Sequence, residues 1–413
     1  MNFKLKHHLS IFAVLPTLLC GQNAPDPTIT DRPLAPPNSI TTPSEETANV
    51  DSHFRKTLQE IIMISSRDLL VAALSAAIAI TWLSAQPHAE GNKPASAKIS
   101  GWKPGVGWGW IWGPNDEVGA LNALNEHTTK AALQLADKGK VYDLGITYSR
   151  NSFKWPGHSP GEIMTFRTPE GTSRQKDHDF IRPEVNSSGT RWHSCALFIN
   201  DNVATQIDGL AHVTVGKDHH WYNGYKEAEW GGDFGVRKCD ATTIPPVIGR
   251  GIMLDIAKLH KVRTLPPHYG ISPQDVDNAI KAQGVTLRPG DVVLFRTGTL
   301  SLWGKDGDDH PALTDADSAG ITLPTAKYLV EKFGAIMIGS DTSGLEVSPA
   351  PEGSDSFIPV HKYLLVEQGV HIAEFHYLED LAKDNVYEFC YVGITNKIAG
   401  STAGFTMRPL AIR

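Results

Sequence analysis

The apolar residues between positions 247 and 375 form a succession of short runs and periodic segments. Runs such as 247–255 and 291–297 are largely apolar and bounded by turn residues, which is typical of buried strands. The segments between such runs carry apolar side chains at helical spacing. Strands and helices therefore alternate here, with mixed strand patterns elsewhere in the chain. This pattern predicts an α/β fold.

Two of the expected helices are marked at their ends. Ser272 and Pro273 supply a capping residue and a proline at the first helical position, and Gly284 ends that helix. A helix over 323–332 ends before Gly334. The other expected helices cover 126–138 and 360–366, and the other expected strands cover 141–147, 192–199, 335–338, 369–373, 387–394 and 407–412, with a hairpin around 162–167 and a short turn at 378–382.

The chain of 413 residues is long enough for one domain of about 300 residues and an extension before it. Residues 1–62 are expected to be that extension. Residues 21–52 within it are polar and rich in Pro, Thr, Ser and Asn, a composition typical of disorder. Residues 90–413 are expected to form the catalytic domain.

Residues 63–89 have the three parts of a secretory signal peptide. Arg67 supplies the charge, residues 69–83 form an apolar run, and small residues follow up to Ala89. The run is too short for a comfortable membrane span, so we expect no stable span in the mature protein. Either translation starts at Met63 and the earlier residues are an over-extended start, or the segment is an N-terminal anchor followed by a linker. Both alternatives predict an exported protein, periplasmic or secreted.

Charge and cysteine content exclude several classes of protein. The formal net charge is −7, so no basic excess indicates a nucleic-acid partner. Cys195, Cys239 and Cys390 follow the signal segment, which allows at most one disulfide between them and excludes a disulfide scaffold. The chain has no Cys-x-x-Cys pair, which argues against structural zinc.

Residues 200–224 hold the polar side chains on which the functional hypothesis depends. Gln206 and Asp208 are two apart, so they point to the same side of an extended strand. His212 follows Gly209, where the chain can bend. An amide oxygen, a carboxylate and an imidazole directed at one point can hold a divalent metal. The structural alternative is a strand end with a satisfied polar network.

Two distant residues can complete such a site. His361 and Glu374 stand near the ends of expected elements, where the sites of α/β folds collect. Each also has a structural interpretation, since His361 can cap a helix and Glu374 can form a buried ion pair. A metal held by this set would activate water, and a nearby free imidazole would carry the proton. Motifs for serine hydrolysis, dinucleotide binding and P-loop chemistry are absent from the sequence.

Two irregular segments indicate an oligomer. Residues 102–125 hold four tryptophans among glycines, which predicts an arm whose indoles pack on the body of the chain or on a partner subunit. Residues 150–190 form a long loop of the kind that serves as a lid or an oligomer contact. His158 and His178 lie in this loop and are not expected to be ligands. We expect a homodimer or homotetramer with exchanged arms.

The chain also carries a series of short motifs in a fixed order. They are Trp112-Gly-Pro-Asn-Asp-Glu-Val-Gly-Ala-Leu-Asn122, Ala204-Thr-Gln-Ile-Asp-Gly-Leu-Ala-His212, Tyr222-Asn-Gly224, Gly249-Arg-Gly251, Gly290-Asp-Val-Val-Leu-Phe-Arg-Thr-Gly298, Gly339-Ser-Asp341, Val360-His361, Gly400-Ser-Thr-Ala-Gly404 and Arg408-Pro-Leu-Ala411. Together, over residues 102–413, they resemble the cyclase family, which includes bacterial kynurenine formamidase and isatin hydrolase. The resemblance implies a swivelling β/β/α fold, an oligomer, and metal-dependent hydrolysis of an amide, lactam or related bond, including an ester or lactone.

The family hallmark is His-x-Gly-Thr-His-x-Asp-x-x-x-His. On this chain its histidines and aspartate fall on Asn202, Gln206, Asp208 and His212, and the distal His and Glu ligands fall on His361 and Glu374. The resemblance therefore implies Asp208, His361 and Glu374 as metal ligands and His212 as the general acid/base. Gln206 would ligate through its oxygen, and Asn202 would either ligate or be displaced from the shell.

Two amides in place of imidazoles shift the expected metal from Zn²⁺ towards harder ions. Mn²⁺ or Zn²⁺ is the expected cofactor, with Mg²⁺ as a third choice. Candidates for the pocket of a small, flat or apolar substrate are His219, His220, Trp221, Tyr222 and His376. Two other functions fit the same residues: a binding protein without turnover, and a lyase or dehydratase that uses the metal to stabilise an enolate.

Overall fold

The computed structural model describes residues 101–176, 183–403 and 405–413, all of which belong to one compact unit, Lys93–Arg413. The expected extension (1–62), the expected signal segment (63–89) and His178 lie outside the described residues. Among the helices that are described, none is long and apolar enough to cross a membrane.

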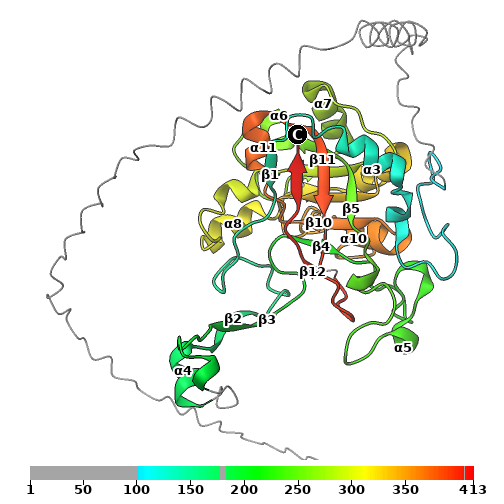
Figure 1. Cartoon of the computed structure of the whole chain (residues 1–413). Helices are drawn as coiled ribbons and strands as arrows, with labels where there is room; N and C mark the ends of the chain where they lie inside the picture. The colour runs from blue at the N-terminus through cyan, green and yellow to red at the C-terminus, as the bar shows by residue number, and fades with distance from the viewer. Residues whose placement is uncertain (1–100, 177–182, 404) are drawn as a thin grey trace, which may run out of the picture. The chain divides into compact units, whose positions relative to one another are not determined.

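Four parallel strands form the centre of a nine-stranded sheet (Figure 1). They are β5 (Val247–Asp255), β7 (Val292–Arg296), β9 (Met337–Ser340) and β10 (His371–Glu374), in that order. Every residue of β7, β9 and β10 is buried. Strands buried on both faces have continuous apolar sequences, which is why these strands can be predicted. The α/β class is confirmed.

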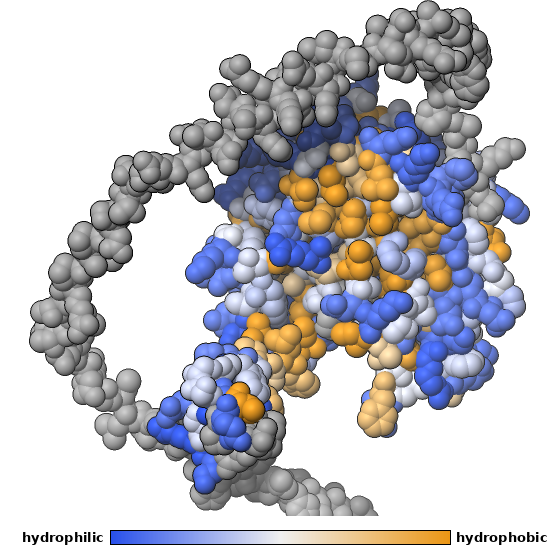
Figure 2. Space-filling view, in the orientation of Figure 1, coloured by the Kyte–Doolittle hydropathy of each residue, from blue (hydrophilic) through white to orange (hydrophobic). Residues whose placement is uncertain are grey.

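Antiparallel strands complete the sheet on both sides. Beyond β5 lie β11 (Glu388–Gly393), β13 (Leu410–Ile412) and β1 (Val141–Asp143). Beyond β10 lie β4 (Gln206–Asp208) and β12 (Phe405–Thr406). In Figure 2, apolar residues gather in the middle of the face on which β11 and β13 lie. The position of β4 brings the 200–224 segment beside the end of β10.

The helix signals are confirmed at their starts, but two helices change their winding. α7 (Pro273–Gln283) is capped by Ser272 and ends at Gly284, whose φ is 66°. The predicted helix over 323–332 is α9 (Leu323–Lys327) followed by a π-helical turn, η6 (Tyr328–Lys332). The one over 360–366 is α10 (Pro359–His361) followed by a second π-helical turn, η7 (Lys362–Glu367). Turns of this kind often lie at functional sites.

The other described elements are short. The helices are α3 (Glu126–Leu133), α4 (Pro169–Arg174), α5 (Glu227–Trp230), α6 (Ile256–Leu259), α8 (His310–Ala316) and α11 (Glu379–Asp384). The 3₁₀ turns are η1 (Gly119–Ala123), η2 (Pro183–Val185), η3 (Tyr222–Gly224), η4 (Ala241–Thr243) and η5 (Thr299–Leu302), and a small parallel pair joins β6 (Gly270–Ile271) to β8 (Gly320–Ile321). α3 ends before the predicted residue 138, and α11 is a helix where only a turn is expected.

The tryptophan-rich arm packs on its own chain. The indole nitrogen of Trp108 donates to the carbonyl of Ala335 at 2.9 Å. Those of Trp102 and Trp110 donate to carbonyls in η6 and η7, each at 2.7 Å. The arm is therefore an irregular cover over the two π-helical turns, in agreement with the first of the two expected packings.

A two-stranded antiparallel ribbon interrupts the domain between β1 and β4. It consists of β2 (Gly161–Arg167) and β3 (Ser194–Ile199), which, among the strands the structure describes, pair with each other and with no third strand. The ribbon exposes large apolar side chains, namely Met164, Phe166, Leu197 and Phe198. The residues before β2 and after β3 lie side by side where the ribbon joins the domain, because Gly161 pairs with Ile199. The ribbon is therefore attached to the domain at one place.

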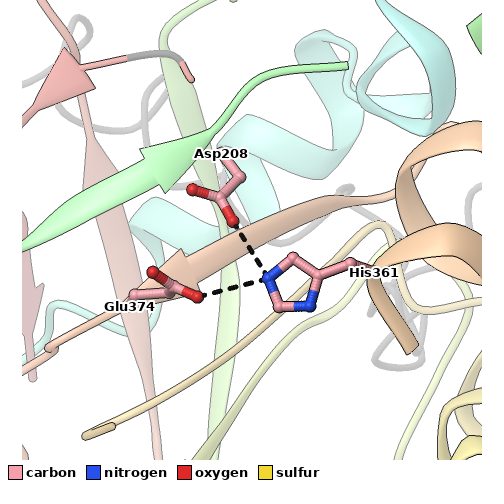
Figure 3. Close-up of side chains that lie close together, drawn as sticks. All are labelled: Asp208, His361 and Glu374. Carbon is pink, nitrogen blue, oxygen red and sulfur yellow. Dashed lines mark ion pairs between the residues drawn. The ribbon is translucent and has the colours of Figure 1, made fainter. Parts of the chain in front are cut away.

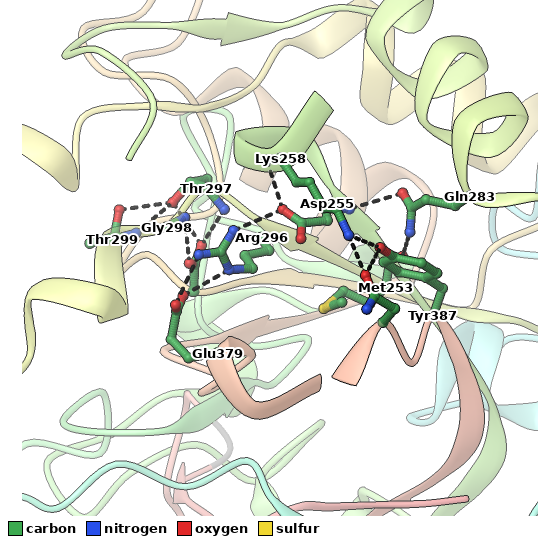
Figure 4. Close-up of polar contacts among 12 residues, drawn as sticks. Met253, Asp255, Lys258, Gln283, Arg296, Thr297, Gly298, Thr299, Glu379 and Tyr387 are labelled. Carbon is green, nitrogen blue, oxygen red and sulfur yellow. Dashed lines mark hydrogen bonds and ion pairs between the residues drawn. The ribbon is translucent and has the colours of Figure 1, made fainter. Parts of the chain in front are cut away.

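A polar network joins the ends of three central strands (Figure 4). Arg296, the last residue of β7, donates to Asp255 at 2.9 Å and to both carboxylate oxygens of Glu379 at 2.8 and 2.9 Å. Asp341 accepts the backbone N–H groups of Thr297 and Gly298, each at 2.8 Å. These contacts hold the carboxyl ends of β5, β7 and β9 in register.

Candidate metal centre

Asp208, His361 and Glu374 meet from three separate segments of the chain (Figure 3). His361 Nε2 lies 3.5 Å from Asp208 Oδ2 and 3.5 Å from Glu374 Oε1. One donor atom from each residue lies within 4.8 Å of the other two, and all three side chains are buried. Carboxylate and imidazole donors that converge in this way can hold a divalent cation.

The antiparallel pairing of β4 with β10 produces half of this geometry. Gln206 lies opposite Glu374, and Asp208 lies opposite Ile372. Because residues two apart share a face of a strand, Asp208 and Glu374 are diagonal neighbours on one face of the sheet. His361 comes from the last position of α10, immediately before the π-helical turn η7.

Each of the three side chains is held by a second polar residue. Asn202 Nδ2 donates to Asp208 Oδ1 at 2.7 Å, and Gln206 Nε2 donates to Glu374 Oε2 at 2.6 Å. The Nδ1 atom of His361 lies 2.5 Å from a carboxylate oxygen of Glu346, which the sequence analysis does not single out. In every case the contact uses the atom that does not face the cluster.

The atoms that do face the cluster lack hydrogen-bond partners. Asp208 Oδ2 and Glu374 Oε1 are buried without a hydrogen bond, as is Gln206 Oε1. Buried polar atoms in proteins are nearly always satisfied, so such atoms call for a ligand or water. A cation beside His361 Nε2 would satisfy both carboxylate oxygens. The residues present therefore fit a divalent metal.

The charges around His361 favour a cation as well. Burial acts to lower the pKa of His361, but the carboxylates of Asp208, Glu346 and Glu374 around the ring outweigh burial and raise that pKa well above its usual range. Burial and the charge of Asp208 raise the pKa of Glu374 in the same way. Three carboxylates around one imidazole leave an excess of negative charge, and a bound cation offsets it.

A cavity of about 1010 Å³ opens onto the cluster. His361 and Glu374 line it, together with Asn202 and His212. The centroids of the His212 and His361 rings are 6.4 Å apart. Burial lowers the pKa of His212, although the charge of Asp208 opposes this shift. His212 is thus neutral at neutral pH and can accept a proton inside the cavity.

A second imidazole, that of His158, also lines the cavity. Its Nδ1 atom is buried without a hydrogen-bond partner, and burial lowers its pKa to about 4. His158 precedes β2, and the pairing of Gly161 with Ile199 brings it beside the segment that leads to Asn202. The sequence predicts only that His158 is not a metal ligand, and among the described residues it is not grouped with the candidate ligands. The hairpin predicted around 162–167 is wrong, since these residues form the single strand β2 and pair with the distant strand β3.

Comparison with known proteins identifies the family to which this chain is related. A family model described as "Putative cyclase" matches residues 142–347. A crystal structure described as a novel cyclase is 27% identical, covers 73% of this chain and 96% of its own, and superimposes with a TM-score of 0.63. The chain belongs to the cyclase family. The resemblance drawn from the ordered motifs is thereby confirmed, while the swivelling β/β/α arrangement stays a prediction.

Two isatin hydrolases are more distant from this cyclase-family chain. Isatin hydrolase A from Ralstonia solanacearum is 17% identical, covers 68% of this chain and 95% of its own, and gives a TM-score of 0.48. Isatin hydrolase A from Labrenzia aggregata, bound to benzyl benzoate, is 17% identical, covers 68% and 97% of the two chains, and gives 0.47. No curated protein sequence matches the chain.

Four residues expected in the pocket of this cyclase-family protein do not line the cavity. His219 is exposed, and His220 lies 2.8 Å from Asp218. Trp221 and Tyr222 are buried in the hydrophobic core. The reason is that His220 bridges back to Val215 and forward to Lys226, so the chain after His212 folds on itself instead of continuing along the cavity.

His376 is also misplaced by the sequence analysis. Strand alternation predicts that it shares the face of Glu374, but β10 ends at Glu374 and Phe375 has a positive φ of 50°. The chain turns there, and His376 Nε2 lies 2.9 Å from the hydroxyl of Tyr391 in the interior. His376 is therefore a buried core histidine and does not line the cavity.

Proposed function

We propose that this cyclase-family protein is a hydrolase that uses a divalent metal to cleave an amide, lactam or related C–N bond in a small substrate. One observation carries the proposal. Three donor atoms, Asp208 Oδ2, Glu374 Oε1 and His361 Nε2, converge beside a cavity that a neutral imidazole also lines. A metal site and a proton acceptor in one cavity are the two requirements of metal-assisted hydrolysis.

Each residue has a distinct task in this reaction. When bound, the metal polarises the scissile carbonyl and lowers the pKa of water. Asp208, Glu374 and His361 would hold it, and two carboxylates with one imidazole suit Mn²⁺ or Mg²⁺ at least as well as Zn²⁺. His212 takes a proton from the attacking water and returns it to the leaving nitrogen, which needs the neutral ring that burial provides.

The walls of the cavity support a flat or apolar substrate. Phe153, Trp155 and Phe357 line it, and Trp155 and Phe357 are exposed to solvent at its edge. Its volume lies at the upper end of the range for small-molecule sites. His158 is placed among these walls as a polar contact for the substrate.

A substrate screen tests this proposal. The full chain, loaded with Mn²⁺, is incubated with cyclic amides and arylformamides in ¹⁸O-water. Hydrolysis must place solvent oxygen in the new carboxylate, whereas a lyase or dehydratase product carries none. Tight binding without turnover of any compound, in Mn²⁺, Zn²⁺ and Mg²⁺ alike, would instead favour a binding protein.

We further propose that the protein is a homo-oligomer, with the dimer as its basic unit, and that the β2–β3 ribbon forms the contact. A lone two-stranded ribbon is marginally stable in water, and its exposed Phe166 and Phe198 are typical of an interface. Sedimentation of the wild type and of a Phe166→Ser/Phe198→Ser double variant tests this. A wild-type monomer, or a variant with an unchanged assembly state, would contradict it.

Export is a separate proposal and rests on residues 63–89. Expression of the full chain should give a periplasmic or secreted protein whose first residue lies near 86–90. Mass spectrometry of the fractionated protein measures this. A cytoplasmic product that keeps residues 63–89 would show that the segment is not a signal peptide.

A further inference from the structure

The polar residues next to the candidate ligands follow one rule. Each touches its ligand through the atom that points away from the cluster, as described above for Asn202, Gln206 and Glu346. All three are buried, and Asn202 and Gln206 present N–H donors to carboxylates. Polar residues placed at random would not all avoid the three atoms that face the cluster, which are Asp208 Oδ2, Glu374 Oε1 and His361 Nε2.

We propose that Asn202, Gln206 and Glu346 are positioning residues, which hold Asp208, Glu374 and His361 as single-atom ligands of one divalent ion. This inference rests on the metal-binding part of the function proposed above. It also differs from the expectation that Asn202 and Gln206 are themselves ligands.

The two amides suit this task physically. A carboxylate has two equivalent oxygens, and an N–H donor that occupies one of them leaves the other to face the ion. Asn202 and Gln206 do so without adding charge, so they do not weaken the attraction of the site for a cation. A lysine or arginine in either place would neutralise a ligand carboxylate. The neutral donors thus order the site and keep its negative charge.

Glu346 orders the imidazole. It accepts the backbone N–H of His361 at 3.0 Å and that of Val360 at 3.1 Å, so α10 fixes its carboxylate. When a metal occupies the site, the imidazole of His361 keeps one proton, and Glu346, which accepts from Nδ1, holds that proton on Nδ1. The lone pair of Nε2 is then free to face Asp208 and Glu374.

Gln206 is the residue for which direct ligation competes with positioning. Its Oε1 atom is buried without a hydrogen-bond partner, whereas its Nε2 atom donates to Glu374. In our proposal the oxygen accepts a hydrogen bond from water at the site. A ligand role and a positioning role predict different behaviour when Glu374 is removed, and this difference can be measured.

Double-mutant cycles separate the two roles. Mn²⁺ and Zn²⁺ affinities of the metal-free full chain are measured by titration, without substrate. Asn202→Ala and Gln206→Ala should each weaken binding by about 10- to 100-fold in the wild type. A positioning residue has no ligand to orient once that ligand is gone, so Asn202→Ala should change affinity less than about twofold in an Asp208→Ala background. Gln206→Ala should behave likewise with Glu374→Ala, and Glu346→Ala with His361→Ala.

Crossed pairs provide the control. Asn202→Ala should keep its full effect in a Glu374→Ala background, because Asn202 contacts Asp208 and not Glu374. An amide that weakens binding equally with and without its own partner would be a ligand, and the proposal would fail for it. Circular dichroism confirms that each variant is folded.

Anomalous diffraction from Mn²⁺-loaded wild-type crystals gives an answer even where a ligand variant binds no metal. We expect one ion per chain, with the amides of Asn202 and Gln206 outside its coordination shell and the carboxylate oxygens about 2.2 Å away. An amide oxygen at that ligand distance, or a second ion, would overturn the inference. Because no substrate is involved, this result stands apart from the test of hydrolysis.

Discussion

Gln206 and Glu374 lie directly opposite each other across the antiparallel strands β4 and β10, and the amide nitrogen of Gln206 donates to Glu374 Oε2 at 2.6 Å. This bond leaves Glu374 Oε1 facing His361 Nε2 at 3.5 Å. Gln206, which was expected to ligate a metal through its oxygen, thus contacts Glu374 through its nitrogen. In the proposed site, the amides of Asn202 and Gln206 orient the carboxylates of Asp208 and Glu374.

Removal of the metal should stop hydrolysis and lower the melting temperature. Dialysis against EDTA followed by Mn²⁺ should restore both, since a ligand at 100 times its Kd stabilises the folded state by about 2.7 kcal/mol. Differential scanning calorimetry and a turnover assay measure the two effects. The matched control is Asp208→Ala, whose melting temperature should not respond to Mn²⁺. A response equal to that of the wild type would place the metal elsewhere.

The rate of hydrolysis should fall at acid pH because His212 becomes protonated there. Burial holds the pKa of His212 below its usual value near 6.5, so the ring is neutral above that value and loses its basic form as the pH falls through the lowered pKa. At saturating Mn²⁺, kcat/KM should be level near pH 7 and decline only well into the acid range. His212→Asn should reduce kcat by about 10²- to 10⁴-fold. An acid limb centred above pH 7, or an active His212→Asn enzyme, would rule out this role.

His158 should affect the substrate and not the metal. Loss of one hydrogen bond to the substrate corresponds to a decrease of about tenfold in kcat/KM for His158→Ala. The affinity for Mn²⁺ should stay within about twofold of the wild type. Among the described residues, the candidate ligands are Asp208, His361 and Glu374, and His158 is not one of them. His127→Ala, on the surface helix α3, is the control. Equal losses of metal affinity and activity would make His158 a ligand instead.

The buried pairing of Arg296 should contribute strongly to stability. Arg296→Met leaves Asp255 and Glu379 without their cation, and breaking a buried pair on one side costs about 3–5 kcal/mol. Urea unfolding measures the change. Arg408→Met removes an exposed pair with Asp143 and should have little effect, because solvent screens that pair. Equal losses for the two variants would show that burial is not the cause.

The central strands could be predicted because burial on both faces leaves a simple pattern. β5 spans 247–255 as predicted, and Ser272 and Gly284 bound α7. Gln206 and Asp208 could be paired as candidates because the strand period of two puts them on one face, and Glu374 was a candidate because it stands near the end of an expected strand. These parts of the site follow from local rules.

Other parts depend on contacts that no local rule supplies. The direction of the Asn202 and Gln206 amides is set by carboxylates brought in by the fold. His158 reaches the cavity only through the register of the β2–β3 ribbon, and His376 leaves it because Phe375 adopts a positive φ. No pattern in the sequence marks Glu346, because its partner, His361, lies on a separate element.

The most direct measurement of the central claim is the metal content of the purified full chain. The protein is saturated with Mn²⁺, passed through a desalting column and analysed by inductively coupled plasma mass spectrometry. We expect one divalent ion per chain for the wild type and for the exposed control Glu352→Gln, and less than a tenth of that for an Asp208→Ala/Glu374→Ala variant. A wild type without bound metal, or a double variant that retains the full amount, would contradict the account.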